Sequence, residues 1–321
     1  MHNLLSEIVI DILEDAIARY GVKLLDALLQ DKTTKKNIIW GTSDYKDLGI
    51  DYEASNEIKS SLITGLNGHI IQPRVTKAKL EQSSRTRDKA EVFTPSWVCN
   101  AQNNLVDNQW FGRKNVFNTE QDNGWIATRE KIEFPDEKKN WKKYVDAQRL
   151  EISCGEAPYL VSRYDTVSGE PIEIPDRIGL LDRKLRVVNE NTETDDEWYE
   201  WCIRAFQSVY GYEYQGDNLL LARENLLYTF IEYYRFRLNK EPDLKQLMYI
   251  ANIISWNLWQ MDALTYTVPY SDIAEVHNQF TIFDYLPEYS YEVIEEPKTE
   301  PCKIKDWRSN CSVTYKSMIK G

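Results

Sequence analysis

The sequence predicts an α/β fold with a doubly wound sheet, in which helices connect parallel strands. Residues 151–160 have the pattern of a strand that ends in a tight turn and opens onto a helix at Tyr159. Two later segments, 253–262 and 303–307, are typical of short strands that end in an acidic residue. Apolar residues at helical spacing separate the first two of these strands, and such alternation of strands and helices indicates a parallel sheet.

The chain opens with a predicted helix, because apolar residues recur at helical spacing from Leu4 to Leu28. The polar run 32–34 then breaks the pattern. The apolar face of this helix requires a partner, and we favour the core of the same chain over a second protein. We therefore expect a mainly helical N-terminal appendage over residues 1–84, followed by a domain over 85–321 that contains the sheet.

Several shorter elements are expected along the chain. Residues 64–68 predict a tight turn before a short strand at 69–71. Residues 118–143 are rich in Asn, Asp, Glu and Lys, which predicts a long loop that covers a bound ligand. Residues 166–171 also predict a loop, whereas the pattern of 178–188 fits a helix and a strand equally well.

Helical insertions are predicted after the turn. Apolar residues recur at helical spacing over 197–209, 219–238 and 244–254. The region between Trp198 and Tyr214 is also rich in aromatic residues. Aromatic rings stack on flipped bases in some nucleic-acid enzymes, but they more often fill a core, and we favour the core here.

The turn at 151–160 suits a small adenosyl cofactor. Glu151 lies near the end of the strand, Cys154 and Gly155 make the turn, and the small Ala157 lets the backbone approach a ligand. Dinucleotide sites use residues without bulky side chains in the same way. A Cys-Gly pair also occurs in turns that bind nothing, so this stretch alone leaves both interpretations open.

A second segment adds a family resemblance. Residues 91–98 read Glu-Val-Phe-Thr-Pro-Ser-Trp-Val and precede the polar run 100–104. Followed by the turn, they resemble the adenine-specific (N6) DNA methyltransferases, in particular the modification subunits of restriction–modification systems. The stretch 85–107 looks especially like chains described as restriction endonuclease subunit M. In that family an aromatic-Thr-Pro element and an Asp/Glu-Pro-x-Cys-Gly-x-Gly-x-Phe-Leu turn line the pocket for S-adenosylmethionine.

The resemblance implies a Rossmann-like class I methyltransferase core over 85–321, with helical insertions, that binds S-adenosylmethionine. Tyr159 and Leu160 also match the family's turn, whereas Ile152 replaces its proline and Ala157 its later glycine. The implied cofactor-binding residues of the two elements are Phe93, Thr94, Pro95, Glu151, Cys154, Gly155 and Ala157.

Two acidic residues complete the implied pocket. The segment that ends in Asp262 resembles the family's Asn-Leu-aromatic-Gly-x-Asp, in which a strand-terminal acid binds the ribose hydroxyls. A carboxylate suits this role because it accepts charge-assisted hydrogen bonds from two neighbouring hydroxyls. Asp306 ends a further predicted strand and resembles the position that contacts the adenine amino group of the cofactor. The alternative is that Asp262 ends a buried strand and binds no cofactor.

The family's catalytic tetrapeptide, Asn/Asp/Ser-Pro-Pro-aromatic, has no counterpart, because the sequence contains no Pro-Pro pair. Residues 156–159 contain Pro-Tyr but belong to the turn, and 285–289 offer no amide or carboxylate where an acceptor is needed. No catalytic residue is therefore assigned. The protein uses a divergent site, borrows one from a partner, or does not methylate.

The formal net charge of −12 over 321 residues argues against nonspecific electrostatic binding to nucleic acid. Basic residues cluster only locally, at 72–79, 85–89 and 138–143, and solvated surface charge is their simplest interpretation. The resemblance implies DNA as the partner, with target recognition supplied by a separate specificity or restriction subunit.

Five cysteines and three histidines are scattered without metal-binding spacing, so we expect no metal site and reduced thiols. Neither a signal peptide nor a membrane-spanning stretch is recognisable, which predicts a cytoplasmic protein without membrane contact. The hydrophobic content of 42% is enough for a sizeable core.

Two other functions are considered. Pro175-Asp176 followed by Asp182-Arg183-Lys184 faintly resembles the pattern of metal-dependent nucleases, in which two carboxylates hold magnesium. An isolated charge cluster is more often a solvated face. The other alternative is a catalytically inactive scaffold that binds the cofactor, which the missing Pro-Pro pair favours.

Overall fold

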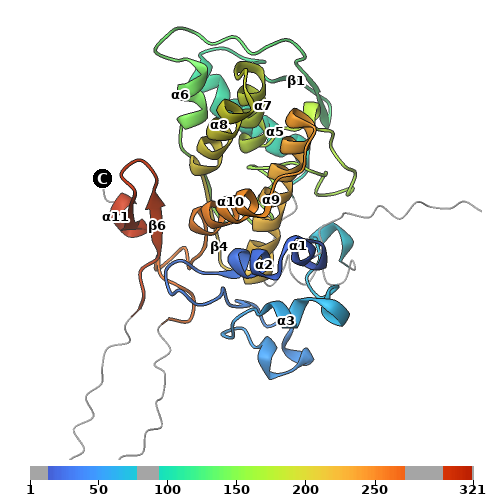
Figure 1. The fold of residues 1–321 in the computed structure, drawn as a ribbon, viewed down its shortest axis with the longest axis vertical. Coiled ribbons are helices and arrows are strands. Elements are labelled where there is room, and N and C mark those ends of the chain that lie inside the picture. Colours follow the sequence, from blue (N-terminus) through green and yellow to red (C-terminus); the bar gives the residue numbers. More distant parts are fainter. Residues whose placement is uncertain (1–13, 78–93, 272–298, 320–321) are drawn as a thin grey trace, which may run out of the picture.

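A three-stranded parallel sheet forms the centre of the molecule (Figure 1). The computed structural model describes residues 14–77, 94–271 and 299–319. Within these residues the strand order is β3-β4-β5, with both neighbouring pairs parallel. The strands are β3 (Arg149–Glu151), β4 (Val209–Glu213) and β5 (Leu258–Gln260). The α/β class predicted from the sequence is thus confirmed.

Helices connect the strands in chain order. Two lie between β3 and β4, and two lie between β4 and β5: α7 (Leu180–Asn191), α8 (Asp195–Gln207), α9 (Gly216–Leu238) and α10 (Leu244–Asn257). The ambiguous segment 178–188 therefore belongs mainly to a helix. A capping box starts α10, where the Asp243 side chain accepts from the Gln246 backbone and the Gln246 side chain accepts in return.

The two faces of the sheet have different neighbours. Val209 and Leu258 belong to the main apolar core that the helices share, whereas Tyr210 and Trp259 belong to a second cluster with Ile304. Successive residues of a strand point to opposite faces, so the connecting helices cover one face. The C-terminal segment covers the other, with β6 (Lys303–Asp306), β7 (Cys311–Thr314) and α11 (Tyr315–Ile319).

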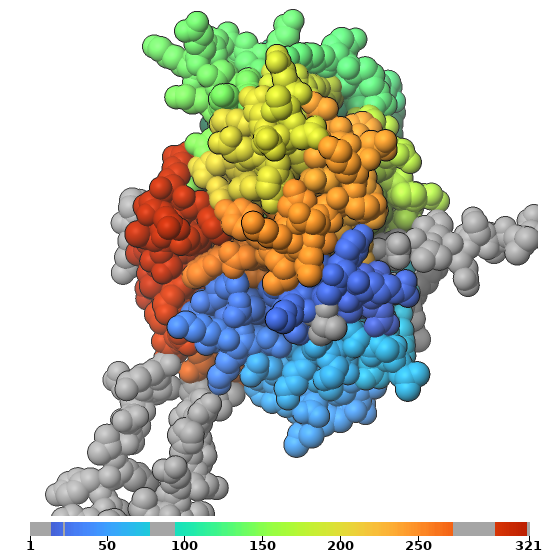
Figure 2. All heavy atoms as spheres, viewed as in Figure 1, coloured from blue at the N-terminus to red at the C-terminus, as the bar shows by residue number. Residues whose placement is uncertain are grey.

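The N-terminal segment packs on the same core. It contains α1 (Glu14–Tyr20) and α2 (Val22–Leu29), which are separated at Gly21, where the backbone φ is +152°. Helix α2 contacts α10, and Figure 2 shows residues 14–77 directly beneath the orange helices. The buried Arg223 of α9 donates to the carbonyls of Leu28, Gln30 and Leu258. The boundary expected near residue 84 lies outside the described residues.

The strand predicted at 69–71 is wrong, because these residues form turns and bends after the short helix α3 (Ser60–Ile63). Short 3-10 helices lie at Lys46–Leu48, Ile50–Tyr52, Gly65–Asn67, Arg74–Thr76 and Ile174–Asp176.

The long loop predicted at 118–143 is also wrong in part. It contains an antiparallel hairpin, β1 (Asn118–Gln121) and β2 (Gly124–Ala127), and the start of α6 (Trp141–Asp146). Asn123 adopts φ 56°, a turn conformation that asparagine tolerates well. The hairpin follows α5 (Ser96–Phe111), whose Asn100 exchanges side-chain hydrogen bonds with Asn118.

Two predicted strands differ from the structure. Residues 253–257 still belong to α10, so β5 is confined to three residues. Residues 303–306 do form a strand, but it pairs antiparallel with β7 in a separate hairpin and does not extend the parallel sheet. Within the described residues, no helix has the length and apolar character needed to cross a membrane.

Candidate functional site

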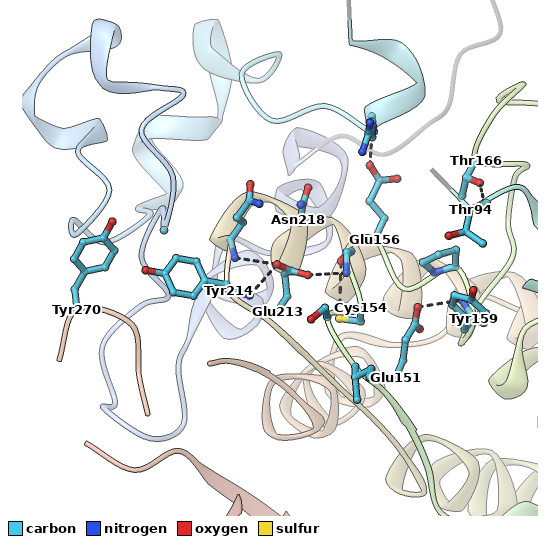
Figure 3. A pocket seen from close by; sticks show the side chains of 17 residues that line it. Thr94, Glu151, Cys154, Glu156, Tyr159, Thr166, Glu213, Tyr214, Asn218 and Tyr270 are labelled. Atoms are coloured by element: carbon cyan, nitrogen blue, oxygen red, sulfur yellow. Dashed lines mark hydrogen bonds between the residues drawn. The ribbon is translucent and has the colours of Figure 1, made fainter. Parts of the chain in front are cut away.

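A cavity of about 530 Å³ opens at the carboxyl ends of β3 and β4 (Figure 3). In open α/β sheets, ligands bind at this end of the strands. The turn 152–156 forms one part of the wall, and residues at the start of α9 form another. Strand-terminal acids, Glu151 and Glu213, lie between them.

The turn after β3 has an unusual backbone. Ser153, Gly155 and Ala157 adopt φ angles of 47°, 52° and 64°, which L-residues with side chains rarely adopt. The Cys154 backbone N–H donates to the Tyr212 carbonyl over 2.8 Å, so the turn is fixed to β4. A Cβ atom at Gly155 would meet no atom within 4 Å, so this glycine faces open space in the cavity. The tight turn predicted from the sequence is present.

No helix starts at Tyr159, contrary to expectation. Ala157 adopts a left-handed conformation, and the residues after it form turns. The backbone N–H groups of Tyr159 and Leu160 instead donate to the two carboxyl oxygens of Glu151, over 3.3 and 3.1 Å. The next α-helix in the chain is α7.

Glu213 binds the turn 152–156 itself. Its Oε2 accepts from the Gly155 N–H over 2.8 Å, and its Oε1 accepts from Tyr214 and Gln215. A carboxylate offers about four acceptor positions, so Oε2 retains room for one further donor. Figure 3 shows Glu213 between the turn and the start of α9.

Burial dominates the electrostatics of the site. It raises the pKa of Glu151 to about 8, against the lowering effect of the two N–H donors. Burial also raises the pKa of Glu213. The low dielectric surroundings favour the neutral carboxylic acids, and a cationic ligand in the cavity would favour the ionised forms.

Glu156 joins the N-terminal segment to the cavity. Its carboxylate accepts from the Arg74 backbone N–H and from the Tyr164 hydroxyl, each over 2.6 Å. The pKa of Tyr164 is raised well above its usual value by burial and by the adjacent Glu156 carboxylate. Arg74 and Glu156 both line the cavity, so residues on both sides of the expected domain boundary contribute to its wall.

Several predicted cofactor-binding residues meet here. Thr94, Glu151, Cys154 and Gly155 line the cavity. The Thr94 carbonyl accepts from the Thr166 hydroxyl over 2.7 Å, which fixes the upstream element beside the turn. Pro95 caps the start of α5 without lining the cavity, and Ala157 is fully buried behind the turn. Phe93 lies outside the described residues.

The predicted acids Asp262 and Asp306 do not line this cavity. The Asp262 carboxylate accepts from the backbone N–H groups of Leu264 and Thr265, which closes a local turn after β5. Asp306 belongs to the separate hairpin and lines a second cavity of about 320 Å³. The sequence pattern identified acids after strands, but only the folded structure shows which of them reach the cavity.

Sequence reasoning missed Glu213. The run Val-Tyr-Gly-Tyr-Glu at 209–213 carries a signal, because β-favouring residues end in an acid immediately before a long helix.

The aromatic residues between Trp198 and Tyr214 were predicted to fill the core. Trp198 is indeed buried, but Tyr214 and Tyr270 are each 37% exposed and lie at the cavity with ring centroids 6.4 Å apart.

The residues of the nuclease pattern do not form one site, because each has a different structural partner. Asp176 forms an exposed ion pair with Arg129, while Asp182 accepts from the Ser162 backbone and hydroxyl. Lys184 is buried and donates to the Ser208 hydroxyl. Within the described residues, no group of three or more His, Cys, Asp or Glu side chains is arranged to hold a metal ion. The five cysteines all lie in that part of the chain and are free thiols.

Comparisons with known proteins add no further identification. No family model, no curated protein and no solved structure matches the chain.

Proposed function

We propose that the protein is an S-adenosylmethionine-binding modification subunit of an adenine-specific DNA methyltransferase, built on a Rossmann-like class I core. The observation that carries the proposal is the turn of residues 152–156 bound between two strand-terminal carboxyl groups, Glu151 and Glu213, at a cavity large enough for a small nucleoside. The resemblance of 91–98 and 151–160 to the methyltransferases supports the same ligand.

The cavity offers a group for each part of this cofactor. The remaining acceptor position on Glu213 suits a ribose hydroxyl, since a charged acceptor strengthens the hydrogen bond. We assign this role to Glu213 in place of Asp262. Gly155 leaves space beside the turn for the sulfonium and amino-acid portion, and we place the adenine near the rings of Tyr214 and Tyr270, which line the cavity.

Charge also favours the cofactor over its product. S-adenosylmethionine carries a sulfonium cation that its demethylated product lacks. Burial raises the pKa of both carboxyl groups, to about 8 for Glu151, and a neighbouring cation favours their ionisation. We therefore expect cofactor binding to release protons, and product binding to release fewer.

Methyl transfer to adenine would require the base to leave the duplex, because its amino nitrogen is otherwise stacked and paired. Direct attack of this nitrogen on the sulfonium methyl breaks one C–S bond and forms one N–C bond, and the methylated nitrogen then loses a proton to water. Alignment therefore provides most of the catalysis. The net charge of −12 suits a subunit that relies on a separate specificity or restriction subunit to bind DNA. The free thiols agree with the cytoplasmic location proposed for such a complex.

The test is isothermal titration calorimetry with S-adenosylmethionine and S-adenosylhomocysteine on the intact chain. Glu213→Gln is compared with Asp262→Asn, its matched control at the end of the neighbouring strand. We expect Glu213→Gln to weaken binding at least tenfold and Asp262→Asn to leave it within twofold. Circular dichroism confirms that each variant is folded.

Each result has a defined meaning. Binding by the wild type that depends on Asp262 and not on Glu213 would refute the ribose assignment while retaining the cofactor. Failure of the folded wild type to bind either compound would overturn the proposed function.

A cofactor-binding scaffold without activity is the second candidate, because the sequence contains no Pro-Pro pair. Transfer of labelled methyl groups to DNA, with and without a neighbouring specificity subunit, distinguishes the two. Cofactor binding without transfer in both settings supports the scaffold.

A further inference from the structure

The side chain of Gln260 joins the N-terminal segment to the wall of the cavity at the carboxyl ends of β3 and β4. Gln260 ends β5 and is the register partner of Glu213 in the parallel sheet. Its Nε2 donates to the carbonyls of Ile39 and Tyr214 over 2.9 and 2.8 Å, and its Oε1 accepts from the Ile39 N–H over 2.9 Å. Gln260 is 1% exposed, so this buried amide uses both of its N–H groups and its carbonyl oxygen within the chain.

Residues 39–41, which we call the strap, lie against the start of α9. The Trp40 carbonyl accepts from the Gly216 N–H over 2.8 Å, at the first residue of that helix. A Cβ atom at Gly216 would lie 1.9 Å from the Ile39 carbonyl oxygen. The two backbones therefore approach so closely that only glycine fits at this position.

The strap forms part of the cavity wall. Gly41 and Tyr214 both line the cavity, and a Cβ atom at Gly41 would lie 2.6 Å from the Tyr214 carbonyl oxygen. The N–H groups of Tyr214 and Gln215 donate to Oε1 of Glu213, the carboxyl group assigned above to the ribose. Gln260 and Glu213 thus hold the same short segment of the wall, Gln260 through its carbonyl group and Glu213 through its N–H groups.

Gln260 itself does not line the cavity, so it acts on a ligand only through the groups that it holds. If the strap opened, Gly41 would leave the wall and the Tyr214 carbonyl would lose its bond to Gln260. Native proteins open locally in this way at a free energy below that of global unfolding.

We propose that the strap and the ligand of the cavity stabilise each other, with Gln260 as the positioning residue that links them. A ligand that contacts Gly41 and Tyr214 together finds both only when the strap is closed, so it binds the closed form more tightly. Such coupling is reciprocal: the ligand slows opening of the strap, and loosening of the strap weakens the ligand. The inference rests on the proposed function, because S-adenosylmethionine and S-adenosylhomocysteine are the ligands that test it.

Hydrogen exchange on the wild-type chain tests the coupling without a variant. The Ile39 N–H donates to Gln260 and the Gly216 N–H donates to Trp40, so both amides report opening of the strap. We expect saturating S-adenosylhomocysteine to slow the exchange of both amides about tenfold, within the usual range of allosteric coupling. The control is the Asn239 N–H, which is bonded at the other end of α9 and should exchange at an unchanged rate.

Two variants that each remove a buried amide separate positioning from stability. Gln260→Met keeps a similar side-chain volume but removes the three hydrogen bonds to the strap and Tyr214. Asn257→Leu removes an amide that donates to the Phe206 and Val209 carbonyls, outside the cavity wall. Both variants should lower the melting temperature, because both leave buried carbonyls unpaired.

Titration calorimetry then distinguishes the two variants. We expect Gln260→Met to weaken the binding of both compounds about tenfold and Asn257→Leu to leave it within about twofold. In Gln260→Met the Ile39 and Gly216 amides should also exchange faster and respond less to the ligand. Circular dichroism confirms that each variant is folded, and if Gln260→Met does not fold, the exchange measurement on the wild type decides.

Four results would overturn the inference. These are strap amides that do not respond to the bound compound, equal slowing at Asn239, unchanged affinity in folded Gln260→Met, and an equal loss of affinity in Asn257→Leu. Each of them leaves the proposed function standing, because the compound still binds the wild type. Failure of the wild type to bind either compound would instead overturn the proposed function, and the coupling with it.

Discussion

Glu151 and Glu213 together hold the segment of residues 155–160 that follows β3. Glu213 accepts from the Gly155 N–H within the turn 152–156, and Glu151 accepts from the Tyr159 and Leu160 N–H groups just after it. The two acids end neighbouring parallel strands, so the sheet register fixes the shape of the turn. Any ligand that changes the ionisation of one carboxyl group will also change how firmly the turn is held.

The first prediction concerns the pH dependence of stability. Burial raises the pKa of Glu151 to about 8, whereas an unfolded glutamate ionises near 4.3. Between these values the folded chain holds a proton that the unfolded chain has released. Stability contributed by this group therefore falls as pH rises from about 4.5 to about 8, with a slope of up to ~1.4 kcal/mol per pH unit.

Glu151→Gln cannot ionise, so the variant should show a shallower decline in the free energy of unfolding over this range. Urea denaturation at pH 5, 6, 7 and 8 measures it. Glu53→Gln, at an exposed position, is the control and should follow the wild type. An unchanged slope in Glu151→Gln would show that this carboxyl group is ionised in the folded chain at pH 5.

The second prediction concerns Ala157, which is fully buried with φ 64°. A left-handed conformation costs an L-residue roughly 1–2 kcal/mol, and glycine avoids this cost. Ala157→Gly relieves this strain, but it also removes a buried methyl group and costs more backbone entropy on folding. We therefore expect the net change to lie between zero and a stabilisation of ~1 kcal/mol. Thermal denaturation measures the change.

Ala157→Val provides the opposite test at the same position. A β-branched side chain is strained in this conformation and has no space in the buried turn, so we expect a loss of ~3 kcal/mol or more. Equal stability of the glycine and valine variants would contradict the observed backbone.

The sequence predicted the local features of the site better than their assembly. The turn at Cys154 and Gly155 was recognisable because glycine has few structural substitutes at such a position. The long helix α9 was also predictable, since apolar residues recur along its length and its interior is buried. Both features depend on neighbouring residues alone.

Assembly was harder to predict because it depends on distant pairing. Asp262, Asp306 and Glu213 each follow β-favouring residues, and nothing local shows that only Glu213 reaches the cavity. β3 and β5 contain three residues each, too few to establish a period. The hairpin at Asn118 was missed because its strands are polar and mostly exposed, so they lack the apolar alternation of a buried strand.

The third prediction concerns the buried ion pair between Arg183 and Asp107, which are 2.5 Å apart. Arg183 also donates to Asn100 and Asn104, and Asp107 accepts from the Tyr144 hydroxyl. Removing one partner leaves an uncompensated buried charge, so Asp107→Ala should cost about 3–5 kcal/mol. Chemical denaturation measures the loss.

The control is the exposed pair of Asp176 and Arg129, for which Asp176→Ala should cost less than about 1 kcal/mol. Similar costs for the two variants would show that burial does not govern the Arg183 pair. The same variant tests the nuclease alternative. If Asp176 bound a catalytic metal, Asp176→Ala would reduce magnesium-dependent cleavage of DNA.

The last prediction concerns Glu224 in the middle of α9. It is fully buried, and neither of its carboxyl oxygens has a hydrogen-bond partner among the described residues. Burial raises the pKa of Glu224 well above its usual value, and the charge of Glu14 raises it further. The folded state therefore holds this proton at pH values where the unfolded state has lost it, so the side chain destabilises the protein increasingly as pH rises.

Glu224→Met removes the polar group at similar volume and should stabilise the protein by about 1–3 kcal/mol at pH 8. The gain should shrink at pH 5, where unfolded glutamate is also partly protonated. Melting temperatures of wild type and variant at both pH values measure this, and an equal loss at both would mean that Glu224 has a structural partner.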